Sequence, residues 1–349
     1  MSKIYVRTIT YNNEDVIARA IESILNQTHS NWVYYICNNG STDTTGEIIE
    51  EYAKKDNRIK TFHNKENFPY TGKFLEIGHN LNDNEYLCIL DGDDSYNIDF
   101  MEKTLALAKK ENLDFVISST DMFHSNGNIT TRQFKDLIVT KENFIQLMYE
   151  FYNRMTAMWG KLYRGDLLRK CTTLNEELID YLGTTWDSYF VREALENSLR
   201  SGFMSYSGYK YYITNKNSTF TSFNPNNLNG CNILYNQSAE ILETKAKKAI
   251  SEEEIIFILD DYCQHLAYHV KSLSEYPNQL SDIKKLELIN QVLRFEYLKL
   301  ATENKIGHSN SVLNEIGEFL GKLNNTMGGL KQYKNVLGKY NRLCKLFNN

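Results

Sequence analysis

The order of apolar and polar positions changes character after about residue 224. Before that point, short apolar runs alternate with segments whose apolar residues recur every three or four positions. The runs predict strands, and the recurring spacing predicts helices. The expected strands are 4–9, 32–37, 59–62, 86–90 and 114–118, and the expected helices are 14–25, 44–55, 71–81 and 99–110. Such alternation is typical of an α/β fold with parallel βαβ units and helices on both sheet faces.

The remainder of the chain has a helical pattern nearly to its end. Helices are expected at 233–249, 252–274, 281–303, 311–323 and 330–347. The stretch from about 206 to 230 is rich in Tyr, Ser, Thr and Asn, and we interpret it as the junction. We therefore expect an α/β domain at 1–228 and an all-α domain at 229–349.

Composition and charge narrow the classes of protein. Of 349 residues, 42% are hydrophobic and 24% are charged, which is ordinary for a globular chain. The net charge of −5 argues against a nucleic-acid partner bound through bulk positive charge. The charge is also segregated: the segment Leu320–Asn349 holds six cations and no acid, so the rest has 33 cations against 44 acids, or −11.

Several features favour a cytoplasmic location. The first residues are too short and too interrupted for a signal peptide, and no apolar run approaches the ~20 residues of a membrane span. The six cysteines are scattered without a Cys-x-x-Cys pair, which is typical of reduced thiols. His265 and His269 share a helix face without a nearby cysteine pair, so we interpret them as ordinary helix residues rather than zinc ligands.

Polar clusters directly follow three of the expected strands. They are Thr10-Tyr11-Asn12-Asn13, Asn38-Asn39-Gly40-Ser41-Thr42-Asp43 and Asp91-Gly92-Asp93-Asp94. In an open parallel sheet, ligands bind outside the carboxyl ends of the strands. The coincidence of three clusters at one sheet edge predicts a ligand site there.

The acidic cluster suits a hard divalent cation, because closely spaced carboxylates repel one another unless a positive group joins them. The alternative is a solvated turn. The Asn38-Asn39-Gly40 cluster has its own alternatives: a tight turn with a helix cap, or amide side chains that meet a nucleobase edge.

These segments resemble a known family. The stretch from Val6 to Thr28, the Asn38–Asp43 turn and the Asp91–Asp94 cluster resemble the start of inverting family 2 glycosyltransferases, which have the GT-A fold, a Rossmann-like mixed sheet flanked by helices. Trp159–Arg164 and Trp186–Phe190 resemble later landmarks of that family. The likeness covers about the first two-thirds of the chain, and the helical region resembles nothing that we can name.

The resemblance implies a set of roles. Thr10, Tyr11, Asn12 and Asn39 would surround the nucleotide base, with Tyr11 stacking on it. Asp91, Gly92 and Asp93 would meet the donor. Asp93 and Asp91, with Asp94 close by, would hold Mn²⁺ or Mg²⁺. Lys73 would face the diphosphate, and Asp187 would be the general base.

One departure concerns the base. The family usually has Asp-Asp where this chain has Asn38-Asn39. An asparagine accepts through its oxygen or donates through its NH₂, so Asn39 is compatible with uracil and tolerates other bases better than an aspartate would. A UDP-sugar is therefore the expected donor.

Alternative interpretations accompany the later landmarks. Trp159 and Trp186 are either core aromatics or part of an acceptor wall. Asp187 is either the catalytic base or an N-cap of the helix through Phe190, or both. In the tail, Leu330, Tyr333, Leu337, Tyr340, Cys344 and Phe347 form an apolar stripe beside basic faces. We favour packing of this stripe on the helical domain over docking to a membrane or a second subunit.

The expected protein is a cytoplasmic, metal-dependent, inverting glycosyltransferase. Its first domain would bind the nucleotide-sugar donor, and its helical domain would serve acceptor binding, assembly or peripheral docking at the inner membrane face. Its acceptor would be a glycan, a lipid-linked glycan or a surface protein such as flagellin. The alternatives are a degenerate nucleotide- or glycan-binding protein, and a nucleotidyltransferase, which lacks support because no Gly-rich phosphate loop is found.

Overall fold

The computed structural model describes residues 2–68, 76–171, 178, 181–213, 223–246, 249–275 and 280–348. The chain divides into two compact units. The first comprises 1–176 and 190–215, and the second comprises 177–189 and 216–349. The functional division into 1–228 and 229–349 stays a prediction.

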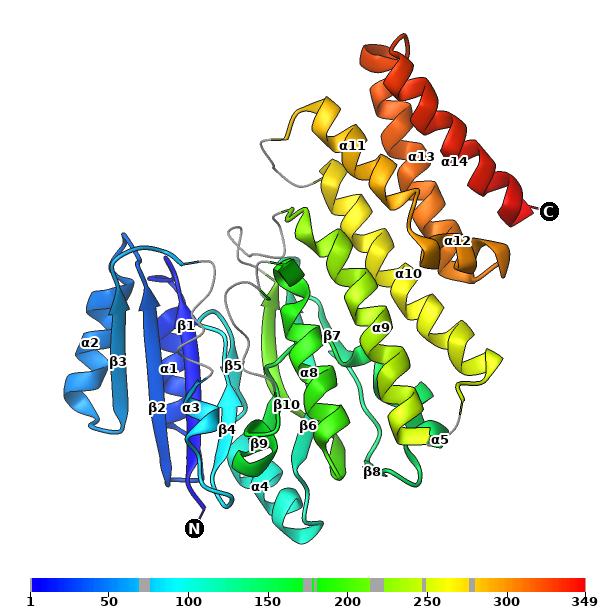
Figure 1. Ribbon diagram of the computed structural model, residues 1–349. Helices are drawn as coiled ribbons and strands as arrows, with labels where there is room; N and C mark the ends of the chain where they lie inside the picture. The colour runs from blue at the N-terminus through cyan, green and yellow to red at the C-terminus, as the bar shows by residue number, and fades with distance from the viewer. Residues whose placement is uncertain are drawn as a thin grey trace. The chain divides into compact units, whose positions relative to one another are not determined.

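A mixed sheet of ten strands forms the centre of the first unit (Figure 1). The strands are β1 (Ile4–Thr10), β2 (Trp32–Asn39), β3 (Ile59–Asn64), β4 (Tyr86–Ile89), β5 (Ser95–Tyr96), β6 (Phe115–His124), β7 (Ile129–Arg132), β8 (Leu137–Thr140), β9 (Lys161–Arg164) and β10 (Arg200–Ile213). Their order is β3-β2-β1-β4-β9-β6-β10-β5, with β7 beside β6 and β8 beside β10. Strands β3, β2, β1 and β4 are parallel, whereas β9 is antiparallel to both of its neighbours.

Helices accompany this sheet. They are α1 (Ile17–Leu25), α2 (Thr45–Lys55), α3 (Glu76–His79), α4 (Phe100–Lys110), α5 (Phe144–Phe151), α6 (Gly165–Leu168) and the part of α8 (Trp186–Asn197) from Phe190 onward, with the 3₁₀ turn η2 (Tyr152–Arg154). The 3₁₀ turn η3 (Gly183–Thr185) and the start of α8 belong to the second unit. Helix α1 shows why the pattern predicted them: Ile17, Ala20, Ile21 and Ile24 are fully buried on one stripe. They join the apolar residues of β1, β2 and β4 in one core.

The second unit is helical. Its helices are α9 (Asn226–Ala246), α10 (Glu252–Glu275), α11 (Asp282–Val292), α12 (Glu296–Glu303), α13 (Gly307–Met327) and α14 (Lys331–Asn348). They share a separate core. The expected packing of the tail is confirmed for most of its stripe: Tyr333 is buried, and Leu337, Tyr340, Cys344 and Phe347 pack against this core, whereas Leu330 is 47% exposed.

The expected junction at about 206–230 includes the boundary between the two compact units at 215/216, together with the end of β10 and the start of α9 at Asn226. One prediction about an element was wrong. The expected helix 281–303 is two helices, α11 and α12, separated by a short turn at Leu293–Phe295.

Candidate functional site

The carboxyl ends of the first strands are in register. Thr10 of β1 pairs with Asn38 of β2, and Asn38 pairs with His63 of β3. On the other side of β1, the backbone N–H of Leu90, just beyond β4, donates to the carbonyl of Arg7 at 3.0 Å. The expected meeting of the three polar clusters at one sheet edge is thereby confirmed.

The loop after β1 is tied to the loop after β2. Asn12 adopts a left-handed backbone with φ of 50°, which asparagine tolerates better than most residues. Its Oδ1 accepts from the backbone N–H of Thr42 at 2.8 Å, and its own N–H donates to Ser41 Oγ at 3.0 Å. Tyr11, between these anchored neighbours and Thr10, is 41% exposed. An exposed ring on a fixed loop is suited to stacking on a ligand.

Asn39 is bound to the segment that follows β3. Its Nδ2 donates to Asn67 Oδ1 at 2.8 Å and to the carbonyl of Phe68 at 2.7 Å. Its Oδ1 accepts from Asn64 Nδ2 at 2.8 Å and from the Phe68 N–H at 3.3 Å. An aspartate could not make the first two bonds, because a carboxylate has no N–H. The asparagine that departs from the family pattern thus has a structural use here.

Gly40 permits this arrangement. Its φ is 74°, and a Cβ at this position would lie 2.6 Å from the backbone nitrogen of Asn67. Only glycine combines that conformation with so close an approach of another backbone.

The acidic loop Asp91–Asp94 is packed against the end of β1. A Cβ on Gly92 would lie 2.6 Å from Thr10 Oγ1 and 2.7 Å from Thr10 Cβ, so a side chain there would push the loop away. Thr10 Oγ1 also accepts from Asn13 Nδ2 at 2.9 Å. Asp91 and Asp93, on either side of the glycine, are both partly exposed.

Asp94 differs from its two neighbours because it is completely buried. Its Oδ2 accepts from Tyr209 Oη at 2.7 Å, and its Oδ1 accepts from the Tyr212 N–H at 2.8 Å. Burial, followed by the charges of Asp93 and Asp91, raises its pKa well above the ordinary value. Asp94 therefore anchors the acidic loop to β10 in this structure, and its predicted contact with a metal is untested.

Three residues that support this loop were missed by sequence reasoning. Tyr209 also accepts from the Asp91 N–H at 3.3 Å, and Arg19 of α1 donates to the carbonyl of Asp93. The Arg19 guanidinium lies 3.6 Å from the centre of the Tyr212 ring, a cation–π contact. The run of tyrosines in β10 (Tyr206, Tyr209, Tyr211 and Tyr212) was a usable signal, but these residues lay in the stretch interpreted as a junction.

Trp159 is a core aromatic, 7% exposed. Its ring stacks on Tyr209 at 4.5 Å and on Tyr211 at 5.4 Å, centre to centre. The core interpretation is therefore the one the structure supports for Trp159. Tyr209 thus links this aromatic stack to the buried Asp94 of the acidic loop.

Asp187 lies in the first turn of α8, the second residue of that helix, and not at its cap. It is partly exposed and belongs to the second compact unit. A helix N-terminus favours the ionised carboxylate. Trp186 is likewise partly exposed, and Lys73 lies outside the described residues.

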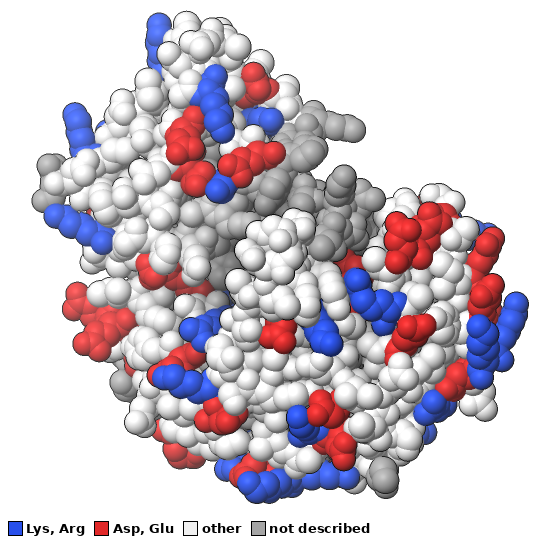
Figure 2. All heavy atoms as spheres, turned by 180° about the vertical axis from the view of Figure 1, so that it is seen from behind, with Lys and Arg blue, Asp and Glu red and all other residues white. Residues whose placement is uncertain are grey.

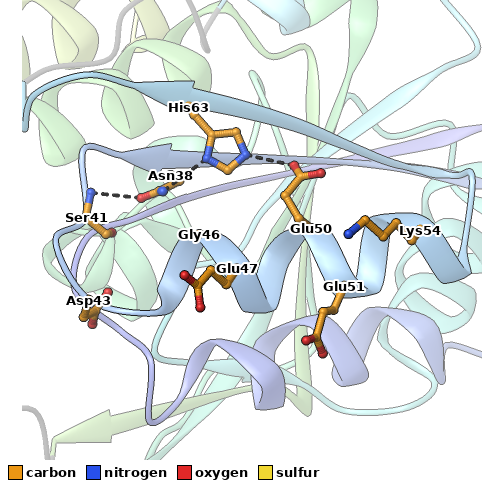
Figure 3. A pocket seen from close by; sticks show the side chains of 9 residues that line it. All are labelled: Asn38, Ser41, Asp43, Gly46, Glu47, Glu50, Glu51, Lys54 and His63. Carbon is orange, nitrogen blue, oxygen red and sulfur yellow. Dashed lines mark hydrogen bonds and ion pairs between the residues drawn. The ribbon is translucent and has the colours of Figure 1, made fainter.

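A shallow groove lies between α2 and β3 (Figure 3). It is lined by Asn38, Ser41, Asp43, Gly46, Glu47, Glu50, Glu51, Lys54 and His63. Asn38 Oδ1 accepts from the Ser41 N–H at 3.0 Å, and Asn38 Nδ2 lies 3.2 Å from His63 Nδ1. The other ring nitrogen of His63 lies 2.9 Å from Glu50 Oε1. Asn38 thus braces the turn that carries Asn39 and Ser41.

The acidic loop fits a divalent cation in the way that nucleotide sites use one. Within the described residues, no group of three or more His, Cys, Asp or Glu side chains converges as an all-protein metal site. Mg²⁺ is commonly bound by one or two carboxylates together with substrate phosphates. Asp91 and Asp93 are two carboxylates of this kind, on a loop that packs against Thr10 and is bound by Arg19 and Tyr209.

Surface charge on one face of the molecule and the hydropathy of the described helices do not mark a further binding surface. On the face shown in Figure 2, Lys and Arg side chains are interspersed with Asp and Glu. No described helix combines the length and the apolar character that a membrane span requires.

Comparison with known proteins gives a family match for the first part of the chain. Residues 5–170 match the model of glycosyl transferase family 2. EpsH of Bacillus subtilis is 31% identical over 163 residues, which is 45% of this chain and 46% of EpsH. Glycosyltransferase GlyA of Streptococcus pneumoniae is 27% identical over 177 residues, 48% of this chain and 25% of GlyA. The matches span less than half the length of these curated relatives.

Solved structures extend the likeness in fold to the whole chain. S. aureus TarS 1–349 in complex with UDP superposes with a TM-score of 0.61 at 17% identity, covering 94% of this chain and 93% of that one. The same TarS fragment with UDP-GlcNAc gives a TM-score of 0.56 at 17% identity, covering 93% and 92%. The fold is thus of the GT-A type with an added helical region, and residues 5–170 match the family 2 glycosyltransferase model.

Proposed function

We propose that this chain transfers a sugar from a UDP-sugar to an acceptor hydroxyl, with inversion at the anomeric carbon. One observation carries the proposal: the acidic loop lies beside the hydrogen-bonded loops that follow β1 and β2, at the carboxyl edge of the sheet. This part of the chain matches the family 2 glycosyltransferase model. The complexes of TarS with UDP and UDP-GlcNAc support the choice of uridine.

In this proposal each residue has a defined task. Tyr11 stacks on the base, Thr10 and Asn12 shape its loop, and Asn39 borders it while holding the segment after β3. Asp91 and Asp93 hold Mn²⁺ or Mg²⁺ and the donor, with Gly92 allowing the close fit and Asp94 anchoring the loop. Lys73 is proposed to face the diphosphate.

The chemistry requires charge stabilisation and one base. A divalent ion bound here would stabilise the negative charge that develops on the leaving diphosphate. Asp187 takes the proton from the acceptor hydroxyl as that oxygen attacks the anomeric carbon. A single displacement of this kind inverts the centre, so one base is sufficient.

The biological setting is proposed more broadly. One relative of the chain is named a putative teichuronic acid biosynthesis glycosyltransferase, TuaG of Bacillus subtilis. We propose a cell-surface glycan, a lipid-linked glycan or a surface protein such as flagellin as acceptor. We place the enzyme in the cytoplasm, with peripheral contact at the inner membrane face or a homodimer through α14 as its assembly mode. The packing of the α14 stripe on the helical core leaves the basic face of that helix for such a contact.

A thermal-shift panel tests the donor and the metal. UDP, GDP, CDP and dTDP are each added with and without Mn²⁺, and we expect the largest rise in Tm with UDP and Mn²⁺ together. A ligand at 100 times its Kd stabilises the folded state by about 2.7 kcal/mol. Asp93→Asn is the matched variant and should lose the metal-dependent part of the shift. If no nucleotide raises Tm in the presence of Mn²⁺, the proposal is wrong.

Transfer activity separates an enzyme from a degenerate binding protein. Asp187→Asn should abolish sugar transfer while the Tm rise with UDP and Mn²⁺ persists. A wild-type chain that binds UDP and Mn²⁺ but neither transfers nor hydrolyses any UDP-sugar would favour the binding protein instead.

A further inference from the structure

The turn that precedes Asp187 is held by the helical unit. Residues 177–189 cluster with 216–349 and not with the sheet. Within this unit, the backbone N–H of Thr184 donates to Asn227 Oδ1 on α9 at 2.7 Å. Asn227 is 3% exposed, so the acceptor of this hydrogen bond is buried, whereas Thr184 lies at the surface.

A buried histidine lies behind Asn227. Asn227 Nδ2 lies 3.3 Å from His269 Nδ1 on α10, and His269 is 6% exposed. Burial, with a smaller contribution from His265, lowers the pKa of His269 to about 3. A neutral imidazole with an unprotonated Nδ1 accepts from the Asn227 amide, and this fixes which way that amide faces. The amide oxygen is then directed to Thr184.

The other side of Asp187 is held by the same helix. Gln237 of α9 donates through Nε2 to the carbonyl of Tyr189 at 2.9 Å, and Gln237 is 8% exposed. Helix α9 therefore binds the backbone at Thr184 and at Tyr189, three residues before and two residues after Asp187.

Two glycines allow this close packing. Gly183 has a φ of 59°, and a Cβ on it would collide with Asn227 Oδ1. A Cβ on Gly230 of α9 would lie 2.8 Å from the carbonyl of Leu182 and would also collide with Thr185 Oγ1. Helix α9 and the turn therefore pack so closely that neither glycine leaves room for a side chain.

We propose that Asn227, oriented by His269, and Gln237 are positioning residues for the general base Asp187. The inference rests on the proposed function in one respect, namely that Asp187 is the base. It gives the helical unit a part in catalysis that is independent of any acceptor contact. A misplacement of about 1 Å costs a reaction of this kind on the order of 100-fold in rate.

The test compares three variants of the full chain. Asn227→Leu removes the acceptor for Thr184, and we expect kcat for transfer to fall about 10- to 100-fold with the KM for UDP-sugar within about twofold. Asn227→Asp keeps an oxygen for Thr184, and the imidazole can meet the second oxygen as its Nδ1–H tautomer, so most of kcat should return. Asn232→Ala is the matched control, because it removes another α9 amide, the acceptor for Tyr262 Oη at 3.1 Å, away from the turn.

The outcomes distinguish the two proposals. If Asp187→Asn is inactive but Asn227→Leu transfers as fast as Asn232→Ala, the positioning role is overturned and the proposed function stands. If Asp187→Asn is fully active, the base assignment fails and the positioning role fails with it. Should Asn227→Leu not fold, Gln237→Leu and the Asn227→Asp rescue decide: a Gln237→Leu kcat equal to that of Asn232→Ala, with unchanged circular dichroism, also overturns the role.

Discussion

At the scale of single residues, neighbouring identical side chains have different environments. Asp91 and Asp93 are partly exposed, whereas Asp94 is buried and accepts from Tyr209 and Tyr212. The sequence shows three carboxylates in four positions and predicts an acidic site. It could not show which of them is buried, because β10 contributes the partners of Asp94 from more than a hundred positions away.

Tyr209→Phe should destabilise the protein and loosen the acidic loop. The change leaves Asp94 Oδ2 without the Tyr209 hydroxyl, and an unsatisfied buried acceptor costs about 1–3 kcal/mol. Chemical denaturation measures the loss in free energy of unfolding. The rise in Tm with UDP and Mn²⁺ measures ligand binding at the acidic loop, and we expect it to be smaller than in the wild type.

Tyr211→Phe is the control for that change. Tyr211 stacks on the same Trp159 ring, and phenylalanine keeps that contact. We expect it to change the free energy of unfolding by less than about 0.5 kcal/mol. Equal losses for the two variants would show that the hydroxyl of Tyr209 does not anchor the loop.

At the scale of elements, strands buried on both faces were predicted well. The expected ranges 4–9, 32–37 and 86–90 correspond to β1, β2 and β4, because their apolar residues form continuous runs. Strand β10 was missed: its end is rich in Tyr, Ser and Gly, and it is a strand because it pairs with β6, β5 and β8. Such pairing depends on distant segments that a local pattern does not contain.

The contact between β2 and the segment after β3 gives a prediction at this scale. Asn39→Asp restores the residue that the family usually has but removes both N–H donors to Asn67 and Phe68. We expect faster hydrogen exchange of the backbone amides of residues 64–68 and a loss of about 1–3 kcal/mol in unfolding free energy.

Nucleotide binding shows whether Asn39 also acts on the base. If Asn39 acts mainly by holding the segment after β3, Asn39→Asp should reduce the rise in Tm with UDP. The reduction should grow with the increase in hydrogen-exchange rate of the backbone amides at 64–68. Unchanged exchange together with an altered preference between UDP and CDP would mean instead that Asn39 acts on the base alone.

At the scale of the whole molecule, the two compact units are not two consecutive pieces of chain. Residues 177–189, which include the predicted base, belong with the helical unit, and the chain then returns to the sheet through α8 and β10. The sequence pattern predicts one domain boundary, where the mixed strand and helix pattern gives way to helices alone. It cannot show that an earlier segment, 177–189, belongs to the later unit. The charge pattern was a better guide, since the basic tail does belong to the helical unit.

Truncation after residue 228 tests this division of labour. The shortened chain keeps the sheet, its separate core and the acidic loop, but loses α9 beyond its start and with it Gln237, His269 and the rest of the helical core. We expect it to retain a Tm rise with UDP and Mn²⁺. We expect its transfer rate to fall by at least about 100-fold, because the backbone around Asp187 loses the contacts of Gln237 and the support of His269.

Circular dichroism and gel filtration establish that the truncated chain is folded and monodisperse. Transfer near the rate of the full chain would mean that the sheet unit positions Asp187 by itself, and loss of the nucleotide shift together with transfer would mean that the units fold only as one.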